Sequence, residues 1–245
     1  MRYLLLLLFT TICFGQQHNK EIKITEVTYQ YLLATSGKEL SPRQEKEQEL
    51  LKTITATFGF TNQLAKYQNQ SNPALYSDLD YFLAKLKLGS NIIYNIKNRT
   101  QFLFLGDSYS NFYFKMPIKN KDWKLVNETK TINNIVCYKA TLVDTYNYQA
   151  SDGTIKEYTK HITAWYAPSI AVPVGLNQMN GLPGLIMQLD EANNGSFIVT
   201  SIVFNKQVPA TYFDAPKRFT ERTDYEAYRE EMRKKMRDVQ NGNFR

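Results

Sequence analysis

The sequence predicts a single α+β domain, mainly antiparallel β, arranged as one curved sheet or half-barrel with a few helices and a C-terminal amphipathic helix. Two observations predict this class. Short runs in which apolar and polar residues alternate recur along the chain, separated by turn residues. The 17 Tyr and 14 Phe favour strands over helices. Since no repeat, low-complexity tract or linker divides the chain, we expect one domain over residues 16–245.

Residues 1–15 have the pattern of a secretory signal peptide. Arg2 supplies a positive charge, residues 4–12 form an apolar run too short to span a bilayer, and small residues precede Gln16. Cleavage near Gly15 is expected, which predicts an exported protein that is periplasmic, on the cell surface or secreted. Lipidation at Cys13 is the alternative, although the residues before it do not match a lipobox. We expect no transmembrane helix after signal removal.

The net charge of +7 becomes +6 when Arg2 leaves with the signal peptide (7 − 1). A positive protein favours acidic partners such as anionic lipid or acidic glycan, while an exported location argues against nucleic acid. The charges are scattered except in the C-terminal segment, so charge alone identifies no partner.

The first half of the mature chain should contain both strands and helices. A strand is expected over 22–33, with a bulge where the apolar spacing slips between Ile24 and Val27. Ser41 and Pro42 favour the start of a helix that covers 43–52. The remaining expected elements are a strand at 54–60, a loop at 62–76, a helix at 78–88 and strands around 92–94, 102–105, 112–114 and 123–126.

One hairpin can be predicted to the residue. Asp152-Gly153 suits a two-residue turn, because both central positions need a positive φ. The turn would join strands at 137–150 and 155–166. In that register Asp144 faces His161, and a shift of one residue would exchange the two faces of the hairpin. One face then carries the large aromatic residues Tyr138, Tyr146 and Trp165.

Two candidate sites follow from this hairpin. The aromatic face, with Trp165, Tyr138 and Tyr146, is the candidate ligand-binding site. Asp144 and His161 are the candidate catalytic residues, acting as a base dyad. The alternative for this pair is an ordinary cross-strand contact, which contributes only about 0.2–1 kcal/mol.

Cysteine and histidine counts limit other chemistry. Cys137 is the only cysteine left after signal removal, so the mature chain cannot form an internal disulfide. We interpret Cys137 as a small apolar core residue; the alternative, a nucleophile, requires a nearby His and a lowered pKa. His18 and His161 are the only histidines, which excludes a polyhistidine or thiolate metal site, and no metal or cofactor is expected. The chain has no nucleotide-binding or nucleophile-elbow motif.

A basic amphipathic helix is expected over about 223–240. Thr223 and Glu226 form a capping box at its start. Its narrow apolar stripe consists of Tyr225, Tyr228, Met232 and Met236, and Arg and Lys residues line the rest. We interpret it as a solvated helix laid across one sheet face, with a membrane-surface or partner-binding helix as the alternative.

The stretch Gly181-Leu182-Pro183-Gly184-Leu185-Ile186 is interpreted as a structural turn. Pro183 and Gly184 suit the second and third positions of a type II turn, after which a buried strand should begin at Leu185. Gly181 should allow close approach of the backbone to an aromatic ring, with Trp165 as the candidate. A binding site at these glycines is the alternative.

The same stretch, spelled GLPGLI and preceded by TAWYAPSIAVPVG, resembles the GLPGLI family of exported proteins common in Bacteroidetes. The segment TINNIVCYKA is similar to the family's preceding strand. The resemblance covers roughly residues 20 to 205 and is densest between Trp123 and Leu189. It implies an exported β-rich protein, with no established activity and no catalytic residue to carry over. A curved sheet that wraps a helix, as in lipoprotein carriers, is our favoured architecture by analogy.

Three functions are therefore weighed. The first is a non-catalytic envelope protein that binds an apolar or amphipathic ligand in an aromatic-lined concavity. The second is a structural or accessory subunit of a cell-envelope complex, for which a flat exposed apolar patch is expected. The third is a hydrolase that uses Asp144 and His161, which requires those side chains within hydrogen-bond reach.

Overall fold

The computed structural model describes residues 20–34, 39–75, 78–106, 111–149, 154–215, 220–225, 227–228, 230–231 and 234. The signal peptide expected at 1–15 and the turn expected at Asp152-Gly153 lie outside these residues. Among the described residues, no helix is long and apolar enough to cross a membrane.

All described strands belong to one open sheet, and the described residues form few helical elements. The helical elements are α1 (Pro42–Lys52), α2 (Leu79–Lys87), and the 3-10 turns η1 (Pro73–Leu75), η2 (Leu176–Gln178) and η3 (Ala210–Phe213). The strands are β1 (Glu21–Leu33), β2 (Ala56–Phe60), β3 (Leu64–Asn69), β4 (Asn91–Asn95), β5 (Thr100–Gly106), β6 (Asn111–Pro117), β7 (Lys124–Ile132), β8 (Ile135–Gln149), β9 (Ile155–Ala167), β10 (Leu185–Glu191), β11 (Gly195–Pro209) and β12 (Thr220–Arg222).

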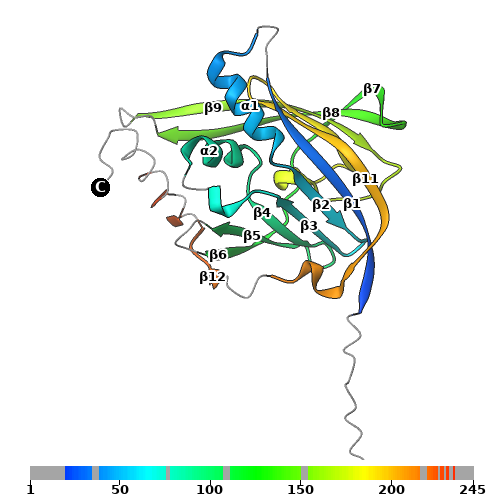
Figure 1. Cartoon of the computed structure of the whole chain (residues 1–245). Coiled ribbons are helices and arrows are strands. Elements are labelled where there is room, and N and C mark those ends of the chain that lie inside the picture. The colour runs from blue at the N-terminus through cyan, green and yellow to red at the C-terminus, as the bar shows by residue number, and fades with distance from the viewer. Residues whose placement is uncertain are drawn as a thin grey trace, which may run out of the picture.

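The strand order is β12-β6-β5-β4-β3-β2-β1-β11-β10-β9-β8-β7, and only the β12–β6 pair is parallel. Figure 1 shows that the sheet is strongly curved: β8 and β9 cross one end, β1 and β11 form the side, and β4, β5 and β6 return below. The helix α1 packs against β1 and α2. A β-rich α+β class built on one large sheet is therefore confirmed.

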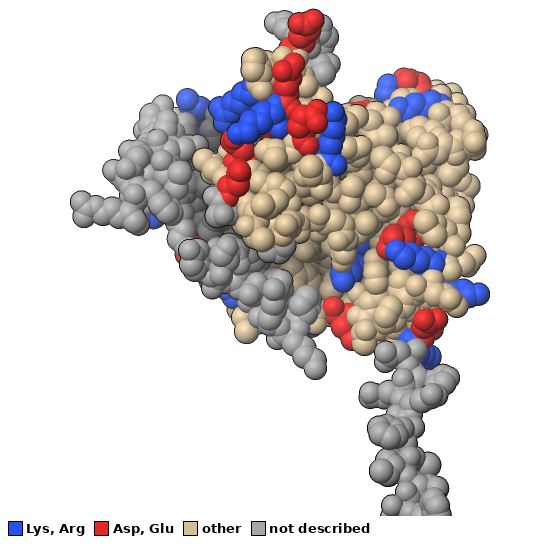
Figure 2. Space-filling view, viewed as in Figure 1, with Lys and Arg blue, Asp and Glu red and all other residues tan. Residues whose placement is uncertain are grey.

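Several local predictions are confirmed. The bulge expected near the start of β1 is present, because the pairing with β11 shifts between Ile24 and Glu26. Helix α1 begins after the N-cap Ser41, as expected, and Gln44 completes a capping box with it. Charged side chains gather on α1 at the top of Figure 2, whereas much of the face below it is uncharged.

The loop expected over 62–76 is wrong, because residues 64–69 form the strand β3. Of the Asn and Gln residues in this stretch, only Gln68 and Asn69 belong to the strand, at its end, and the others flank it. Its centre buries Ala65 and Tyr67 completely, so two alternate inward side chains are enough to hold it in the sheet.

One face of the curved sheet, here called the inner face, is lined by buried apolar residues. One row of directly paired residues crosses β1 to β6 on this face, and a second row starts on β1 and crosses β11, β10, β9 and β8. The first row is Val27, Phe58, Tyr67, Ile92, Leu103 and Phe114. The second is Tyr31, Phe197, Leu189, Ala164 and Ala140.

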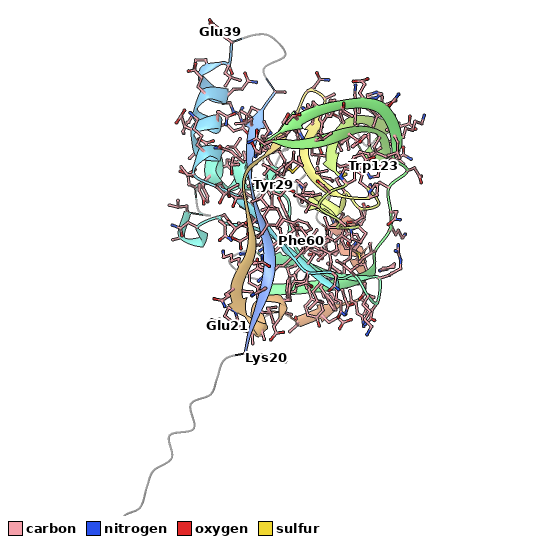
Figure 3. The ribbon with its side chains drawn as sticks, turned by 90° about the vertical axis from the view of Figure 1, so that its right-hand side faces the viewer. Lys20, Glu21, Tyr29, Glu39, Phe60 and Trp123 are labelled. Atoms are coloured by element: carbon pink, nitrogen blue, oxygen red, sulfur yellow. The ribbon has the colours of Figure 1, made fainter. Side chains whose placement is uncertain are left out.

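Three buried tyrosines on the inner face donate hydrogen bonds to backbone carbonyls outside their own strands. The hydroxyl of Tyr29 donates to the Ile186 carbonyl at 2.6 Å, and that of Tyr67 donates to the Leu88 carbonyl, where α2 ends, at 2.5 Å. The hydroxyl of Tyr94 donates to the Gly175 carbonyl at 2.8 Å. Figure 3 shows Tyr29 midway along β1, well inside the body of the protein. Burial raises the pKa of Tyr29 and Tyr94 far above the ordinary tyrosine value.

The register of the β8–β9 hairpin differs by one residue from the prediction. Val143 pairs with His161, and Asp144 pairs with Lys160. The last paired residues are Gln149 and Ile155, so the connection has an odd number of residues rather than the two that we expected. Because alternate residues face opposite sides of a strand, this shift exchanges the faces of the whole second strand.

The C-terminal helix expected over 223–240 falls mostly outside the described residues. Within them, the Tyr228 amide donates to the Asp224 carbonyl at 2.9 Å, which is the spacing of a helical turn. Tyr225 packs against Phe114 with ring centroids 4.9 Å apart, and Tyr228 packs against Phe112 at the same distance. These two residues of the expected apolar stripe are therefore used in packing against β6.

The hydroxyl of Tyr29 should stabilise the fold measurably. We expect Tyr29→Phe to lower the free energy of unfolding by about 1–3 kcal/mol, because the buried Ile186 carbonyl loses its partner. Tyr31→Phe is the matched control: Tyr31 lies on the same strand, is 2% exposed, and its hydroxyl has no hydrogen-bond partner among the described residues. Its stability should stay within about 0.5 kcal/mol of wild type or rise. Chemical denaturation measures both; equal losses would contradict this account.

Candidate functional site

A cleft of about 540 Å³ opens on the inner side of the sheet, between strands β5, β6 and β8 and the segment that carries η2. We call it the amide cleft, because five of its lining residues have amide side chains. Its lining residues are Gln101, Met116, Pro117, Lys119, Asn120, Lys121, Asp144, Asn177, Gln178, Met179, Asn180 and Tyr225. This volume lies in the range of roughly 300–1,000 Å³ that is usual for ligand sites.

One wall of the amide cleft is the segment 168–184, which is held on the sheet by Tyr94 of β4. The Tyr94 hydroxyl donates to the Gly175 carbonyl and accepts from the Gln178 amide at 3.3 Å. Asn180, which is 1% exposed, stabilises this segment through hydrogen bonds of its side chain. Its Oδ1 accepts from the Gly175 amide at 3.1 Å, and its Nδ2 donates to the Lys119 carbonyl at 3.3 Å. The wall is therefore fixed by hydrogen bonds before any ligand arrives.

The backbone at the tip of this wall is unusual. Asn177 and Gln178 have successive positive φ angles of 49° and 63°, which few residues other than glycine adopt. The tip also lies close to the end of α2: a Cβ atom added at Gly89, whose φ is 74°, would lie 1.8 Å from Asn177 Oδ1. Non-glycine residues with such angles cluster at functional sites, where the surrounding structure holds them in place.

Gln101 places an unsatisfied polar atom in the wall of the amide cleft. This residue of β5 is 4% exposed, and its Nε2 donates to Gln178 Oε1 at 3.0 Å. Its own Oε1 is buried and has no hydrogen-bond partner within the described part of the chain. If the Gln101 side-chain amide were rotated by 180°, its Nε2 would occupy the unpartnered position instead of its Oε1. An unsatisfied buried polar group costs about 1–3 kcal/mol, so Gln101 favours a partner that the described residues do not provide.

Charged groups stand at the mouth of the amide cleft. Lys121 Nζ lies 3.1 Å from Asp144 Oδ2, and both side chains are about one third exposed. Lys119 is exposed. Asp144 is the only carboxylate among the lining residues, so the lining carries a net positive charge. The sequence had suggested Asp144 as a catalytic residue. It did not point to Gln101, because nothing in the sequence distinguishes this glutamine from the others.

The stretch Gly181–Ile186 forms the corner that ends this wall, but not as a type II turn. Gly184 does not have the positive φ that this turn needs; among the described glycines only Gly89 and Gly181 do. Gly184 is required for space instead, because a Cβ there would lie 2.3 Å from the Ala167 carbonyl oxygen. Gly181, with φ 104°, approaches Asn120 rather than Trp165. Pro183 is exposed, and the strand expected after Gly184 is present as β10.

The expected aromatic site is not assembled. Trp165 pairs with Lys139 and therefore lies on the sheet face opposite to Tyr138, which pairs with Tyr166. Lys130 Nζ lies 4.3 Å from the centre of the Trp165 ring, so a cation covers it. Tyr138 is 42% exposed and lines a different, shallow depression of about 560 Å³ with Val136 and Pro168. The Tyr146 side chain lies outside the described residues.

The expected dyad is not brought together either. Asp144 faces the inner side, where it pairs with Lys121, while the exposed His161 points to the opposite face beside Val143. Cys137 is fully buried, and desolvation raises the pKa of its thiol, which opposes the thiolate that a nucleophile needs. Its Sγ contacts the Ile135 carbonyl at 3.4 Å. Within the described ranges, no group of three His, Cys, Asp or Glu residues could hold a metal ion.

Comparison with known proteins supports a fold and leaves function open. Residues 123–188 match the family described as "Protein of unknown function (Porph_ging)". A search of curated proteins finds no match. Two solved structures of PNGF-II, in the C2 and P21 space groups, are similar to this chain with TM-scores of 0.54 and 0.51, each at 16% identity. They match 85% and 86% of this chain, which spans only 32% and 33% of theirs. This likeness shows a shared fold.

Asn180 should be essential to the wall of the amide cleft. We expect Asn180→Ala to lower the free energy of unfolding by about 1–3 kcal/mol, since a buried backbone group loses its partner. Asn120→Ala is the control in the same cleft: Asn120 is exposed and should change stability by less than about 0.5 kcal/mol. Thermal and chemical denaturation compare the two. Similar small losses for both variants would show that Asn180 does not hold this wall.

Proposed function

We propose that the protein is an exported, non-catalytic binding protein that takes an amphipathic ligand into the amide cleft. The observation that carries this proposal is the buried, unpartnered Oε1 of Gln101 in the cleft wall. A bound ligand that donates a hydrogen bond would satisfy it, and the gain would contribute to affinity.

The lining supports an amphipathic ligand. Met116, Met179 and Tyr225 offer apolar surface, while the amides and the Lys121–Asp144 pair offer donors and acceptors. Such a mixture of apolar surface with a few fixed polar groups is typical of sites for small ligands. Because Tyr94 and Asn180 fix the wall in advance, little conformational entropy is lost on binding.

A second candidate function, an accessory subunit of an envelope complex, is supported by a separate feature. Val136, Tyr138 and Leu125 are apolar residues of β7 and β8 that are 53%, 42% and 63% exposed. Exposed apolar residues that lie close together are typical of surfaces for protein partners. The two functions use different residues, so they can be tested separately.

Protein recovered from the native envelope can be used to test whether it holds a bound ligand. Native mass spectrometry should find wild type with a bound adduct and with an N-terminus near Gln16, where the signal peptide ends. Asn120→Trp, which places a large ring in the amide cleft, should reduce the adduct by about tenfold or more. Asn62→Trp, an exposed position outside the cleft, should retain it.

Two outcomes would contradict the proposal. Wild type recovered without any adduct would remove the evidence for a carried ligand. An adduct equally abundant in Asn120→Trp and in wild type would place the ligand elsewhere, for example at the exposed apolar residues of β7 and β8.

A further inference from the structure

We infer that the ligand of the amide cleft is a short acidic peptide segment. This inference rests on the proposed function and names the chemical class of its ligand. Three features of the lining carry it: the hydrogen-bonding groups, the kind of apolar surface and the sign of the charge.

The hydrogen-bonding groups match those of a peptide. Gln101, Asn120, Asn177 and Gln178 reach the cleft from three parts of the chain, and each amide has both donor and acceptor atoms. A peptide group offers the same two functions in the same planar arrangement. A backbone N–H of the ligand would supply the donor that the buried Gln101 Oε1 lacks.

The apolar surface suits aliphatic side chains. Met116 and Met179 line the cleft, and methionine is flexible enough to adapt to side chains of differing shape. The Tyr225 ring is already in edge contact with Phe114, with an interplanar angle of 68°. Neither Trp123 nor Trp165 lines the cleft; the indole of Trp123 donates to the Asn180 carbonyl at 3.1 Å, behind the wall. Trp123 is labelled in Figure 3, on the other side of the view from β1.

The charge favours an acidic segment. Lys119 and Lys121 line the cleft against the single carboxylate of Asp144, which Lys121 already neutralises in part. Arg99 stands beside them, because its Nη2 donates to Asn120 Oδ1 at 3.4 Å. Complementary charge raises both the association rate and the discrimination against basic competitors.

The test uses three pools of end-capped hexapeptides. The peptides of one pool carry two acidic residues, those of the second carry two basic residues, and those of the third carry no charge. Fluorescence anisotropy at low salt measures the binding of each pool. We expect the acidic pool to bind about tenfold or more tightly than the basic pool, with a preference that decreases as salt screens the charges. A neutral oligosaccharide such as chitotriose, used as a competitor, should not displace the peptide.

Two pairs of variants separate the contribution of the buried Gln101 acceptor from that of the charge at the cleft. Gln101→Leu should weaken binding of the acidic and uncharged pools alike by about tenfold, since the buried acceptor is lost. The exposed Gln70, outside the cleft, is the matched control, and Gln70→Leu should bind as wild type. Lys119→Glu should reverse the preference between acidic and basic pools, whereas Lys97→Glu, at an exposed position outside the lining, should retain it. Circular dichroism confirms that each variant is folded.

The inference is overturned if no pool binds, if the pools bind equally, or if chitotriose binds in their place. These results are distinguishable from a failure of the proposed function. A native adduct that Asn120→Trp abolishes, together with no binding of any peptide pool, would retain the binding function and reject only the peptide class.

Discussion

The hydrogen bonds from buried tyrosine hydroxyls to backbone carbonyls are the constraint on which the rest of this structure depends. A curved sheet with an apolar inner face must be covered, and the covering segments bring backbone groups that lose their water. Tyr67 and Tyr94 satisfy carbonyls of these covering segments, and Tyr29 satisfies the Ile186 carbonyl of β10, where the pairing with β9 shifts. Each ring also adds apolar surface to the core. The cover is thereby fixed in position as well as buried.

The amide cleft is a consequence of this arrangement. Tyr94 bonds both Gly175 and Gln178, so the same side chain that anchors the segment 168–184 also fixes the tip that faces the cleft. Gln101, which pairs directly with Tyr94 across β4 and β5, donates a hydrogen bond to Gln178 at the same tip. Rigid walls reduce the conformational entropy that is lost when a ligand binds.

Much of the fold could be predicted because it depends on local pattern. Alternation identified most strands, and the spacing slip in β1 located its bulge. The failures have two causes: the length of a connection, and contacts between segments that are distant in the sequence. The hairpin register depends on the length of its connection, Gly184 is needed because of Ala167, and β3 is a strand through its neighbours. The candidate site could not be predicted, since Gln101 and Gln178 come together only in the folded sheet and no motif joins them.

The most direct test of this account is hydrogen exchange in Tyr94→Phe, followed by mass spectrometry at peptide resolution. If Tyr94 fixes the cover, its loss should raise exchange in the segment 168–184 by about tenfold or more, while the β8–β9 hairpin exchanges as in wild type. Unchanged exchange in 168–184 would contradict the account, because the segment would then be held by its apolar contacts alone and the tyrosine hydroxyl would have no part in shaping the cleft.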